Sequence, residues 1–314
     1  MSIGSSTVPI QTQAVTQAPR QLLRVGPDRE VRSIAEAARR ARDGDIVEVD
    51  AGIYRRESAV WTQDDLSIRT AGGRVRLFAD GEAAEGKAIW VVRGGRIDVE
   101  GFDFNGARVP TGNGAGIRFE SGALVLTDCR FLDNEMGLLS AGRPEMQLAI
   151  HHCTFGDAPR HDSGMLHHLL YVGAIGQCVV MHSRFFNGWR GHLMKSRARI
   201  NRILWNEFVD GPEGEASYEL EFPNGGDNLV QGNRIEQSAH SQNPALLSMG
   251  AEARGQFTGR LVLRDNHFIN QGSSSEEKPA RFVHLWSESL AGTVEVLAEG
   301  NTFEGPGLRG LPQR

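Results

Sequence analysis

The sequence has few cysteines, no long apolar run and no excess of basic charge. Its 314 residues include only three cysteines, too few and too odd in number for a disulfide framework. No apolar run approaches the roughly 20 residues needed to span a bilayer, so we expect no membrane partner. Lysine and arginine total 34 against 39 aspartate and glutamate residues, which argues against nucleic acid as the main partner.

Several motifs that bind cofactors or carry a nucleophile are also missing. The sequence contains no glycine-rich phosphate loop, no nucleophile elbow and no CxxC pair, so no nucleotide cofactor is implied. The N-terminus lacks the basic start and apolar stretch of a signal peptide, and residues 1–20 are rich in Ser, Thr, Gln, Ala and Pro. We expect a flexible tail there, which would suit a secreted or periplasmic chain after removal of a signal peptide.

What the sequence does contain is a repeat that ends on a phenylalanine. Cysteine lies two residues before Phe in Cys129-Arg130-Phe131 and in Cys153-Thr154-Phe155. Related three-residue motifs, called Phe marks below, recur at steps of about 23–35 residues. The segments between marks alternate with period two and are interrupted by Gly, Asn and Asp, which disfavours a helical solenoid. The pattern predicts an all-β, single-domain parallel β-helix over residues 21–304. The marks end at Phe104, Phe131, Phe155, Phe185, Phe208, Ile235, Phe268 and Phe303.

Equivalent positions of successive coils should stack about 4.8 Å apart. The Phe marks would then form a column of rings in the core, and the residues two positions before them would form a ladder. Cys129 and Cys153 occupy this ladder position in the earlier coils, where free thiols are expected more often than a disulfide. In the later coils the ladder consists of Asn206, Asn233, Asn266 and Asn301.

The N-terminal end of the solenoid carries a helix pattern. Residues 31–42 are amphipathic, with Ser33 as N-cap and Gly44 just past the end. This segment and the following Asp45–Val49 and Gly52–Tyr54 resemble the N-terminal cap and first coil of right-handed parallel β-helix proteins of the pectate-lyase type. The resemblance implies a right-handed solenoid with an N-terminal capping helix. Residues 305–314 are expected to form a C-terminal tail.

Polar residues concentrate on three consecutive coils, between about residues 167 and 227. The flanking coils have Leu, Ser and Met at the equivalent positions. A localised cluster indicates a site, because a structural surface would scatter its charges. Its members are His167, His168, Tyr171, Arg190, His192, Lys195, Arg197, Arg199, Tyr218, Glu219, Glu221 and Asn224.

Strand alternation suggests how these side chains are arranged. Period two predicts that Leu220 and Phe222 point inward, and that Glu219 and Glu221 point outward. Their spacing from the preceding Phe marks predicts that Lys195 and Glu219 are neighbours on adjacent coils, with Tyr171 as the third member of the group.

A basic groove with tyrosine suits an extended acidic polysaccharide, because cationic side chains match uronic carboxylates. β-Elimination requires a cation at the carboxylate, a base for the proton at C5 and an acid for the leaving oxygen. Lys195 is the candidate base, with Arg197, Arg199 and partial burial expected to lower its pKa. Tyr171 or His192 is the candidate acid, or an alternative base. The candidate substrate-binding residues are His168, Arg190, Arg199, Tyr218, Glu219, Glu221 and Asn224.

The coil that carries Lys195 also resembles a known family. Lys195-Ser196, Asn201, Asn206 and Phe208 are similar to the lysine-bearing coil of β-helix alginate lyases and chondroitinase B-like lyases. Those lyases place acidic calcium ligands a few residues before the lysine, where this chain has the segment 188–190, Gly-Trp-Arg. Calcium is therefore one option as cofactor, and the other is that the Arg of this segment, Arg190, neutralises the substrate carboxylate in its place.

Three other functions stay open at this stage. A glycoside hydrolase could use Glu219 and Glu221 as its two carboxylates. A C5-epimerase shares the proton abstraction of a lyase, and a non-catalytic binder could stack its tryptophans on sugars. Metal chelation is not indicated by the adjacent pairs His151-His152 and His167-His168, whose side chains would point to opposite faces of a strand. The longer insertion between Phe155 and Phe185, which includes His161 and Asp162, is expected to overhang the groove.

Overall fold

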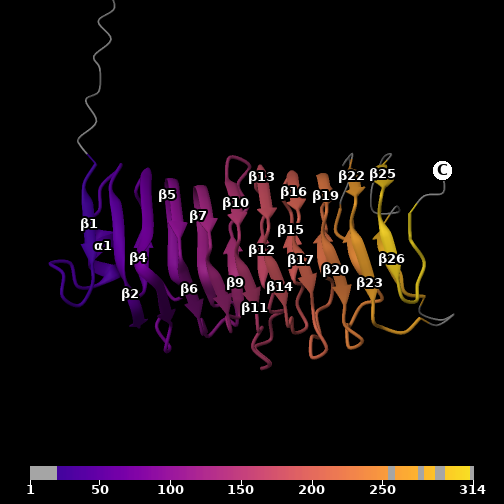
Figure 1. Ribbon diagram of the computed structural model, residues 1–314, viewed down its shortest axis with the longest axis horizontal. Helices are drawn as coiled ribbons and strands as arrows, with labels where there is room; N and C mark the ends of the chain where they lie inside the picture. Colours follow the sequence, from indigo (N-terminus) through magenta and orange to yellow (C-terminus); the bar gives the residue numbers. More distant parts are fainter. Residues whose placement is uncertain (1–19, 254–258, 275–278, 287–293, 312–314) are drawn as a thin grey trace, which may run out of the picture.

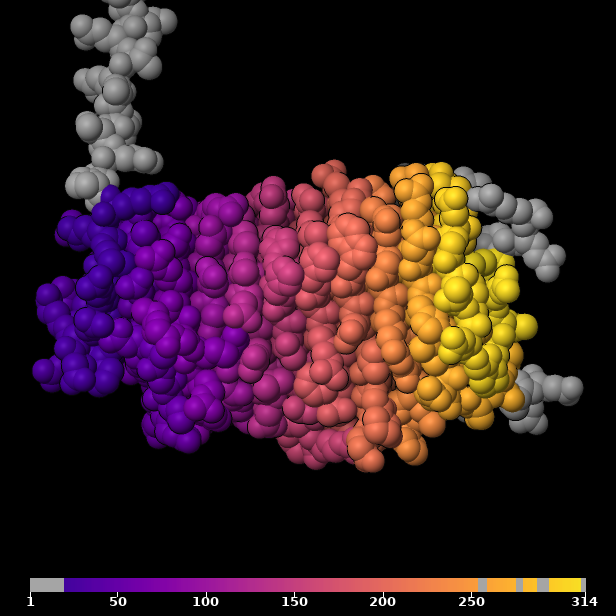
Figure 2. Space-filling model, viewed as in Figure 1, coloured from indigo at the N-terminus to yellow at the C-terminus, as the bar shows by residue number. Residues whose placement is uncertain are grey.

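Each coil of the chain adds strands to parallel sheets that run along the molecule (Figure 1). The structure, a computed structural model, describes residues 20–253, 259–274, 279–286 and 294–311. All strand pairs in the register are parallel, so the prediction of an all-β parallel β-helix is confirmed. Figure 2 shows the coils following one another in sequence order along an elongated body.

The 26 strands of the described residues are joined by their pairings into one continuous sheet. The register divides it into three stacks of strands, which are called the first, second and third sheets below. The first sheet contains β1 (Leu22–Val25), β10 (Gln147–His151), β13 (Gln177–Met181), β16 (Ile200–Leu204), β19 (Asp227–Gln231), β22 (Arg260–Arg264) and β25 (Glu295–Glu299). The second contains β6 (Phe102–Asn105), β8 (Arg130–Leu132), β11 (Thr154–Gly156), β14 (Arg184–Phe186), β17 (Glu207–Val209), β20 (Arg234–Gln237), β23 (His267–Asn270) and β26 (Thr302–Glu304).

The third sheet contains β3 (Ala59–Trp61), β9 (Met136–Ser140), β12 (Leu170–Val172), β15 (Met194–Ser196), β18 (Leu220–Phe222), β21 (Ala245–Met249) and β24 (Arg281–Leu285). Four long strands bend from one sheet into the next. β2 (Ile46–Arg55) and β4 (Asp65–Phe78) join the first sheet to the second. β5 (Ala88–Glu100) and β7 (Ala115–Thr127) join the third sheet to the first.

The phenylalanine column forms as predicted. Successive rings from Phe104 to Phe208 lie 4.6–4.9 Å apart, with their planes within 13° of parallel. Ile235 interrupts the column, and Phe268 and Phe303 continue it at 5.3 Å. Rings buried in this way remove a large apolar area from water in every coil, so the column stabilises the stacking of the coils.

The ladder beside the column is confirmed as well. The backbone N–H of Asn206 donates to the side-chain oxygen of Asn233 (2.8 Å), and the same contact repeats from Asn233 to Asn266 and from Asn266 to Asn301. Cys129 and Cys153 lie at the equivalent positions of the earlier coils as free thiols. The backbone N–H of Cys129 donates to the sulfur of Cys153 at 3.4 Å. The ladder satisfies buried backbone donors at the turns, which would otherwise be unpaired.

Replacing Asn301 with alanine is expected to lower the free energy of unfolding by about 1 kcal/mol. The Asn301 side-chain oxygen accepts from the backbone N–H and from the side-chain amide of Asn266, and both hydrogen bonds would be lost. The side-chain amide would keep its other acceptor, the carbonyl of Val230. Urea unfolding of the full chain measures the difference. Thr302→Ala, an exposed neighbour, serves as the control and should change the value by less than about 0.5 kcal/mol. Equal effects of the two substitutions would contradict a stabilising role for the ladder.

The only helix among the described residues is α1 (Ile34–Arg40), which is shorter than the predicted 31–42. Ser33 is its N-cap, since the Ser33 hydroxyl accepts from the N–H of Glu36. The helix ends at Ala41 in an extended conformation, so Gly44 is not its C-terminal cap as expected. Its burial of Ile34, Ala37 and Ala38 is compatible with a cap, and the capping role and the right-handed sense of the coil stay predictions.

Residues 1–19 of the expected N-terminal tail lie outside the described residues. At the other end, the chain after β26 returns to β24, where Leu308 pairs with Arg281. The backbone N–H of Leu308 donates to the carbonyl of Ala280. A search of the described residues finds no helix long and apolar enough to cross a membrane.

Candidate active site

A column of polar side chains crosses neighbouring strands of the third sheet. The register pairs Tyr171 on β12 with Lys195 on β15, and Lys195 with Glu221 on β18. Ser248 on β21 continues the column after Glu221. Tyr171 is thus beside Lys195 as predicted, whereas the predicted pairing of Lys195 with Glu219 is wrong because Glu221 takes that position.

Glu219 is buried in the core, so its predicted outward position is wrong. The side chain has no exposed surface, and the backbone places it between Leu193 and Leu246 of the adjacent coils. The alternation Leu220 in, Glu221 out, Phe222 in begins only with strand β18, and Glu219 precedes that strand. Glu219 therefore cannot contact a substrate in this structure, and a hydrolase that uses Glu219 with Glu221 is not supported.

Lys195 is held between two carboxylates. Its Nζ lies 3.0 Å from Oε2 of Glu221 and donates to Oε1 of Glu252 at 2.8 Å. Only 8% of the residue is exposed. The charged groups closest to Nζ are thus carboxylates rather than the arginines of the sequence prediction, and a neutral Lys195 stays a prediction.

Arg197 connects several members of the predicted cluster. Its Nε donates to the hydroxyl of Tyr171 (2.8 Å), Nη1 donates to Asn224 (2.6 Å) and Nη2 donates to Glu252 (2.7 Å). Because the Tyr171 oxygen accepts from Arg197, its own proton remains available for donation to another group. Glu252 bridges Arg197 and Lys195, and so ties the two cations together.

Two histidines lie behind this group. The backbone N–H of His192 donates to Nδ1 of His168 (2.9 Å), which assigns the proton of the neutral His168 ring to Nε2. Burial, together with the nearby positive charge of His192 and Lys195, holds the pKa of His168 well below its usual range. His192 Nε2 lies 2.9 Å from Glu221, and burial outweighs this contact and lowers the pKa of His192.

Glu221 is the charged centre of the buried side of the cluster. Burial opposes its ionised form, but the contact with His192 and the positive charge of Lys195 outweigh burial and lower its pKa. A carboxylate in this setting fixes the positions of both neighbours. Tyr218, a further predicted binding residue, is 9% exposed and packs with its ring 5.2 Å from that of His192.

The structure places two predicted arginines outside this group. Arg190 stacks on the ring of Trp189 at 4.6 Å and approaches Asp162 at 4.0 Å, beside the inserted loop. Arg199 is exposed at the turn that leads into β16. Neither position supports the idea that Arg190 replaces calcium next to Lys195.

The described residues around Lys195 do not fit calcium well either. Calcium requires several oxygen ligands. The oxygens present there belong to Glu221, Glu252 and Asn224, and each of these side chains already contacts Lys195 or Arg197. These oxygens therefore already have cationic partners within the protein.

A cavity of about 640 Å³ opens beside the cluster. His168, Tyr171 and Arg197 line it from the third sheet, and residues 164–166 of the inserted loop form another part of its wall. The loop thus borders the groove, in line with the expectation that it overhangs the site. Lys195 does not line the cavity, since Glu252 and Arg197 lie around its amino group.

Sequence reasoning missed Glu252 and the far wall of the cavity. Glu252 lies 57 residues after Lys195 in a turn, and no spacing rule relates the two positions. Arg118 and Ser140 line the cavity from β7 and β9, in coils for which the sequence predicts no site residue. Arg118 pairs with Leu139 and Leu139 pairs with Tyr171, so the repeat places Arg118 in the same column as Tyr171.

Solved structures of polysaccharide lyases have the same fold. A PL6 family alginate lyase, AlyGC, matches with a TM-score of 0.59 and 15% identity, over 96% of this chain and 42% of that chain. Pectate lyase Pel9A matches with a TM-score of 0.55 and 11% identity, over 91% of this chain and 79% of that chain. The chain therefore spans less than half the length of the alginate lyase.

At such identities the likeness shows the fold alone, a parallel β-helix that is shared with alginate and pectate lyases. No protein-family model matches the sequence, and no curated protein matches it.

Proposed function

We propose that the protein is a polysaccharide lyase that cleaves an acidic polysaccharide, one containing uronic acid, by β-elimination outside the cytoplasm. The observation that carries the proposal is the group of Tyr171, Lys195 and Arg197, which combines a proton donor, an amine and a guanidinium beside a cavity on the β-helix. The two lyases that share the fold act on polysaccharides according to their names, which agrees with this class of substrate.

The reaction assigns one task to each member of the group. The guanidinium of Arg197 pairs with the uronate carboxylate, which makes the proton at C5 more acidic. The amine of Lys195 leaves Glu252, turns toward the cavity and accepts that proton, and the C5–H electrons form the C4=C5 double bond while the C4–O4 bond breaks. Tyr171 gives its proton to the leaving oxygen. His168 packs against the ring of Tyr171 at 5.4 Å, Asn224 accepts a hydrogen bond from Arg197, and Glu221 contacts Lys195, so these three residues hold the group in place.

Product analysis tests the proposal directly. The full chain is incubated with alginate, polygalacturonate and a neutral glucan, and ultraviolet absorbance follows the unsaturated uronate that only elimination produces. Absorbance that grows with an acidic polymer and not with the glucan supports the lyase. Shorter chains without absorbance would indicate hydrolysis, exchange of solvent deuterium into intact chains would indicate an epimerase, and binding without any change would indicate a binder. Each of these three results would overturn the proposal.

Replacing Glu252 with glutamine is expected to lower kcat/KM for the elimination by about 2–5-fold. The Glu252 carboxylate lies 2.8 Å from Nζ of Lys195 and 2.7 Å from Nη2 of Arg197, and so holds the two cations side by side, whereas glutamine keeps the length of the side chain and loses the charge. Since the Glu252 side chain is 46% exposed, solvent screens both contacts and the expected effect stays small. The initial rate of absorbance increase measures it. Glu207→Gln, on the second sheet, is the matched control and should leave the rate unchanged. An unchanged rate in the Glu252 variant would show that this carboxylate does not position the two cations.

A further inference from the structure

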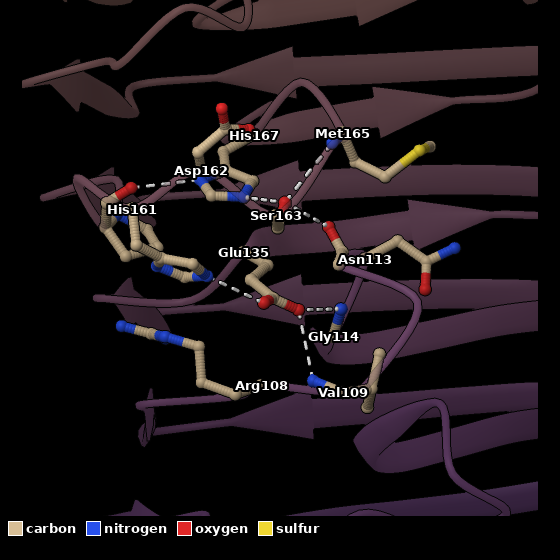
Figure 3. A network of polar contacts seen from close by, with 12 residues as sticks. Arg108, Val109, Asn113, Gly114, Glu135, His161, Asp162, Ser163, Met165 and His167 are labelled. Carbon is tan, nitrogen blue, oxygen red and sulfur yellow. Dashed lines mark hydrogen bonds and ion pairs between the residues drawn. The ribbon is translucent and has the colours of Figure 1, made fainter.

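A second cluster of polar side chains lies where the inserted loop meets the preceding coil (Figure 3). Glu135 comes from the turn before β9, whereas His161 and His167 come from the loop between β11 and β12. One ligand atom from each of the three residues lies within 4.8 Å of the other two. None of these residues contributes to the group around Lys195.

Glu135 is prepared as an anionic ligand. The residue is only 2% exposed, and its Oε2 accepts two backbone hydrogen bonds, from Val109 (3.1 Å) and from Gly114 (2.7 Å). Two N–H donors on one oxygen fix the orientation of the carboxyl group. The other oxygen, Oε1, faces Nε2 of His161 at 3.1 Å.

His167 is prepared as a neutral ligand. It is fully buried, and its Nδ1 lies 2.9 Å from the carbonyl oxygen of Pro159. A carbonyl oxygen only accepts, so Nδ1 carries the proton and Nε2 presents its lone pair to the cluster. Ser163 Oγ lies 2.7 Å from this Nε2. A histidine whose second nitrogen is held by a backbone carbonyl is the usual arrangement of a metal ligand.

We propose that Glu135, His161 and His167 bind a divalent transition-metal ion, with zinc as the best match, and that the ion fastens the inserted loop to the coil below it. Two imidazole nitrogens and one carboxylate oxygen are a ligand set that zinc accepts, whereas calcium and magnesium prefer oxygen alone. Ligand atoms 2.0–2.1 Å from a tetrahedral zinc lie about 3.3 Å apart. The pair Glu135–His161, at 3.1 Å, already has this separation, and the ligand atoms that lie up to 4.8 Å apart would move together by up to about 1.5 Å when the ion binds.

The position of the cluster gives the ion a structural task. His161 and His167 flank residues 164–166, which form part of the wall of the cavity beside Tyr171. Glu135 belongs to the coil before the loop, so an ion bound by all three would tie that wall to the body of the solenoid. Without an ion, the side-chain contacts from His161 to Glu135 and from Ser163 to Gly112 connect the loop to the preceding coil. The bridges of His167 with Trp189 and Arg190 connect the loop to the following coil.

The alternative is an ordinary ion pair between a protonated His161 and Glu135. The neighbouring guanidinium of Arg108 does not require Glu135 as a partner, since it pairs with Asp133 at 2.6 Å. An ion pair would bind no metal ion, whereas the proposed site would bind one ion through all three side chains.

Metal titration of the full chain decides between the two. The protein is stripped with a chelator, and zinc is then titrated in competition with a chromophoric chelator, for the wild type, His161→Ala and Glu135→Gln. The His161 side chain is 42% exposed, so its loss should leave the fold intact, which a melting curve verifies. The control is the double variant His152→Ala/His182→Ala. It removes a stacked pair of exposed histidines that follow β10 and β13 of the first sheet.

We expect one zinc ion per chain in the wild type and in the control, with affinity at least about 100-fold lower in His161→Ala and Glu135→Gln. Zinc should also raise the melting temperature of the wild type and slow proteolysis within residues 157–168, and it should do neither in His161→Ala. The proposal is overturned if the wild type binds no zinc, if the His161 variant binds as tightly as the wild type, or if only the control loses binding. These readouts do not depend on polysaccharide cleavage, so they stand apart from the proposed lyase function.

Discussion

Replacement of Lys195 with methionine is expected to lower kcat/KM for the elimination by about 10²–10⁴-fold, the usual contribution of a general base. Methionine retains the length of the side chain and removes the amine, so the packing of a residue that is 8% exposed is disturbed little. The measurement is the initial rate of absorbance increase with the acidic polymer on which the wild type is most active.

The control for this substitution is Arg202→Ala. Arg202 lies on β16 of the next sheet of the same coil and pairs with Asp227 at 3.0 Å, so its loss removes a cation without touching the cavity. We expect the control to retain wild-type rates. A folded Lys195→Met protein with undiminished rates would remove Lys195 from the mechanism, even if the protein proves to be a lyase.

The fold could be predicted from the sequence because its determinants repeat. A phenylalanine two residues after Cys, Ser or Asn recurs in nearly every coil, and stacking converts this local pattern into a column and a ladder. The same regularity placed Tyr171 beside Lys195, since both lie on short strands at equivalent positions of adjacent coils. Positions inside a strand are therefore predictable from period two and from the repeat.

The parts of the site that could not be predicted depend on bends and on long sequence separations. Period two was extended across the bend before β18, and this gave the wrong direction for Glu219. Glu252 reaches Lys195 from a turn 57 residues away, and Glu135 meets His161 from a different coil. The lengths and conformations of these turns decide the contacts, and a single sequence contains no repeat from which to infer them.

A leucine in place of Glu219 is expected to raise the free energy of unfolding by about 2–4 kcal/mol at pH 8. Glu219 lies in a row with Leu193 and Leu246, has no exposed surface, and one of its carboxyl oxygens has no partner among the described residues. A leucine would match its neighbours in the row and remove a buried polar group that is poorly paired.

The pH dependence of this gain identifies its cause. Burial, and then the charge of Asp210, raise the pKa of Glu219 well above its ordinary value. A carboxyl group with a raised pKa in the folded state contributes stability while it is protonated, and this contribution is lost as the pH rises through the folded-state pKa. Leucine cannot ionise, so the advantage of the variant should be largest at pH 8 and should shrink toward pH 4. Burial raises the pKa of Asp210 to about 6, so Asp210 also makes the stability fall as the pH rises. Asp210 is present in both proteins and therefore does not account for the difference between them.

Glu221→Leu provides a matched comparison two residues away, because the same chemical change there should lower stability. Glu221 lies 3.0 Å from Lys195 and 2.9 Å from His192, and its removal leaves a buried ammonium with one partner fewer. Urea unfolding at pH 4, 6 and 8 compares the two variants. Since Glu219 has no access to the cavity, Glu219→Leu should also retain cleavage of the polymer. A loss of both stability and cleavage in Glu219→Leu would mean that this carboxyl group has a partner or a role that a buried position in a row of leucines does not explain.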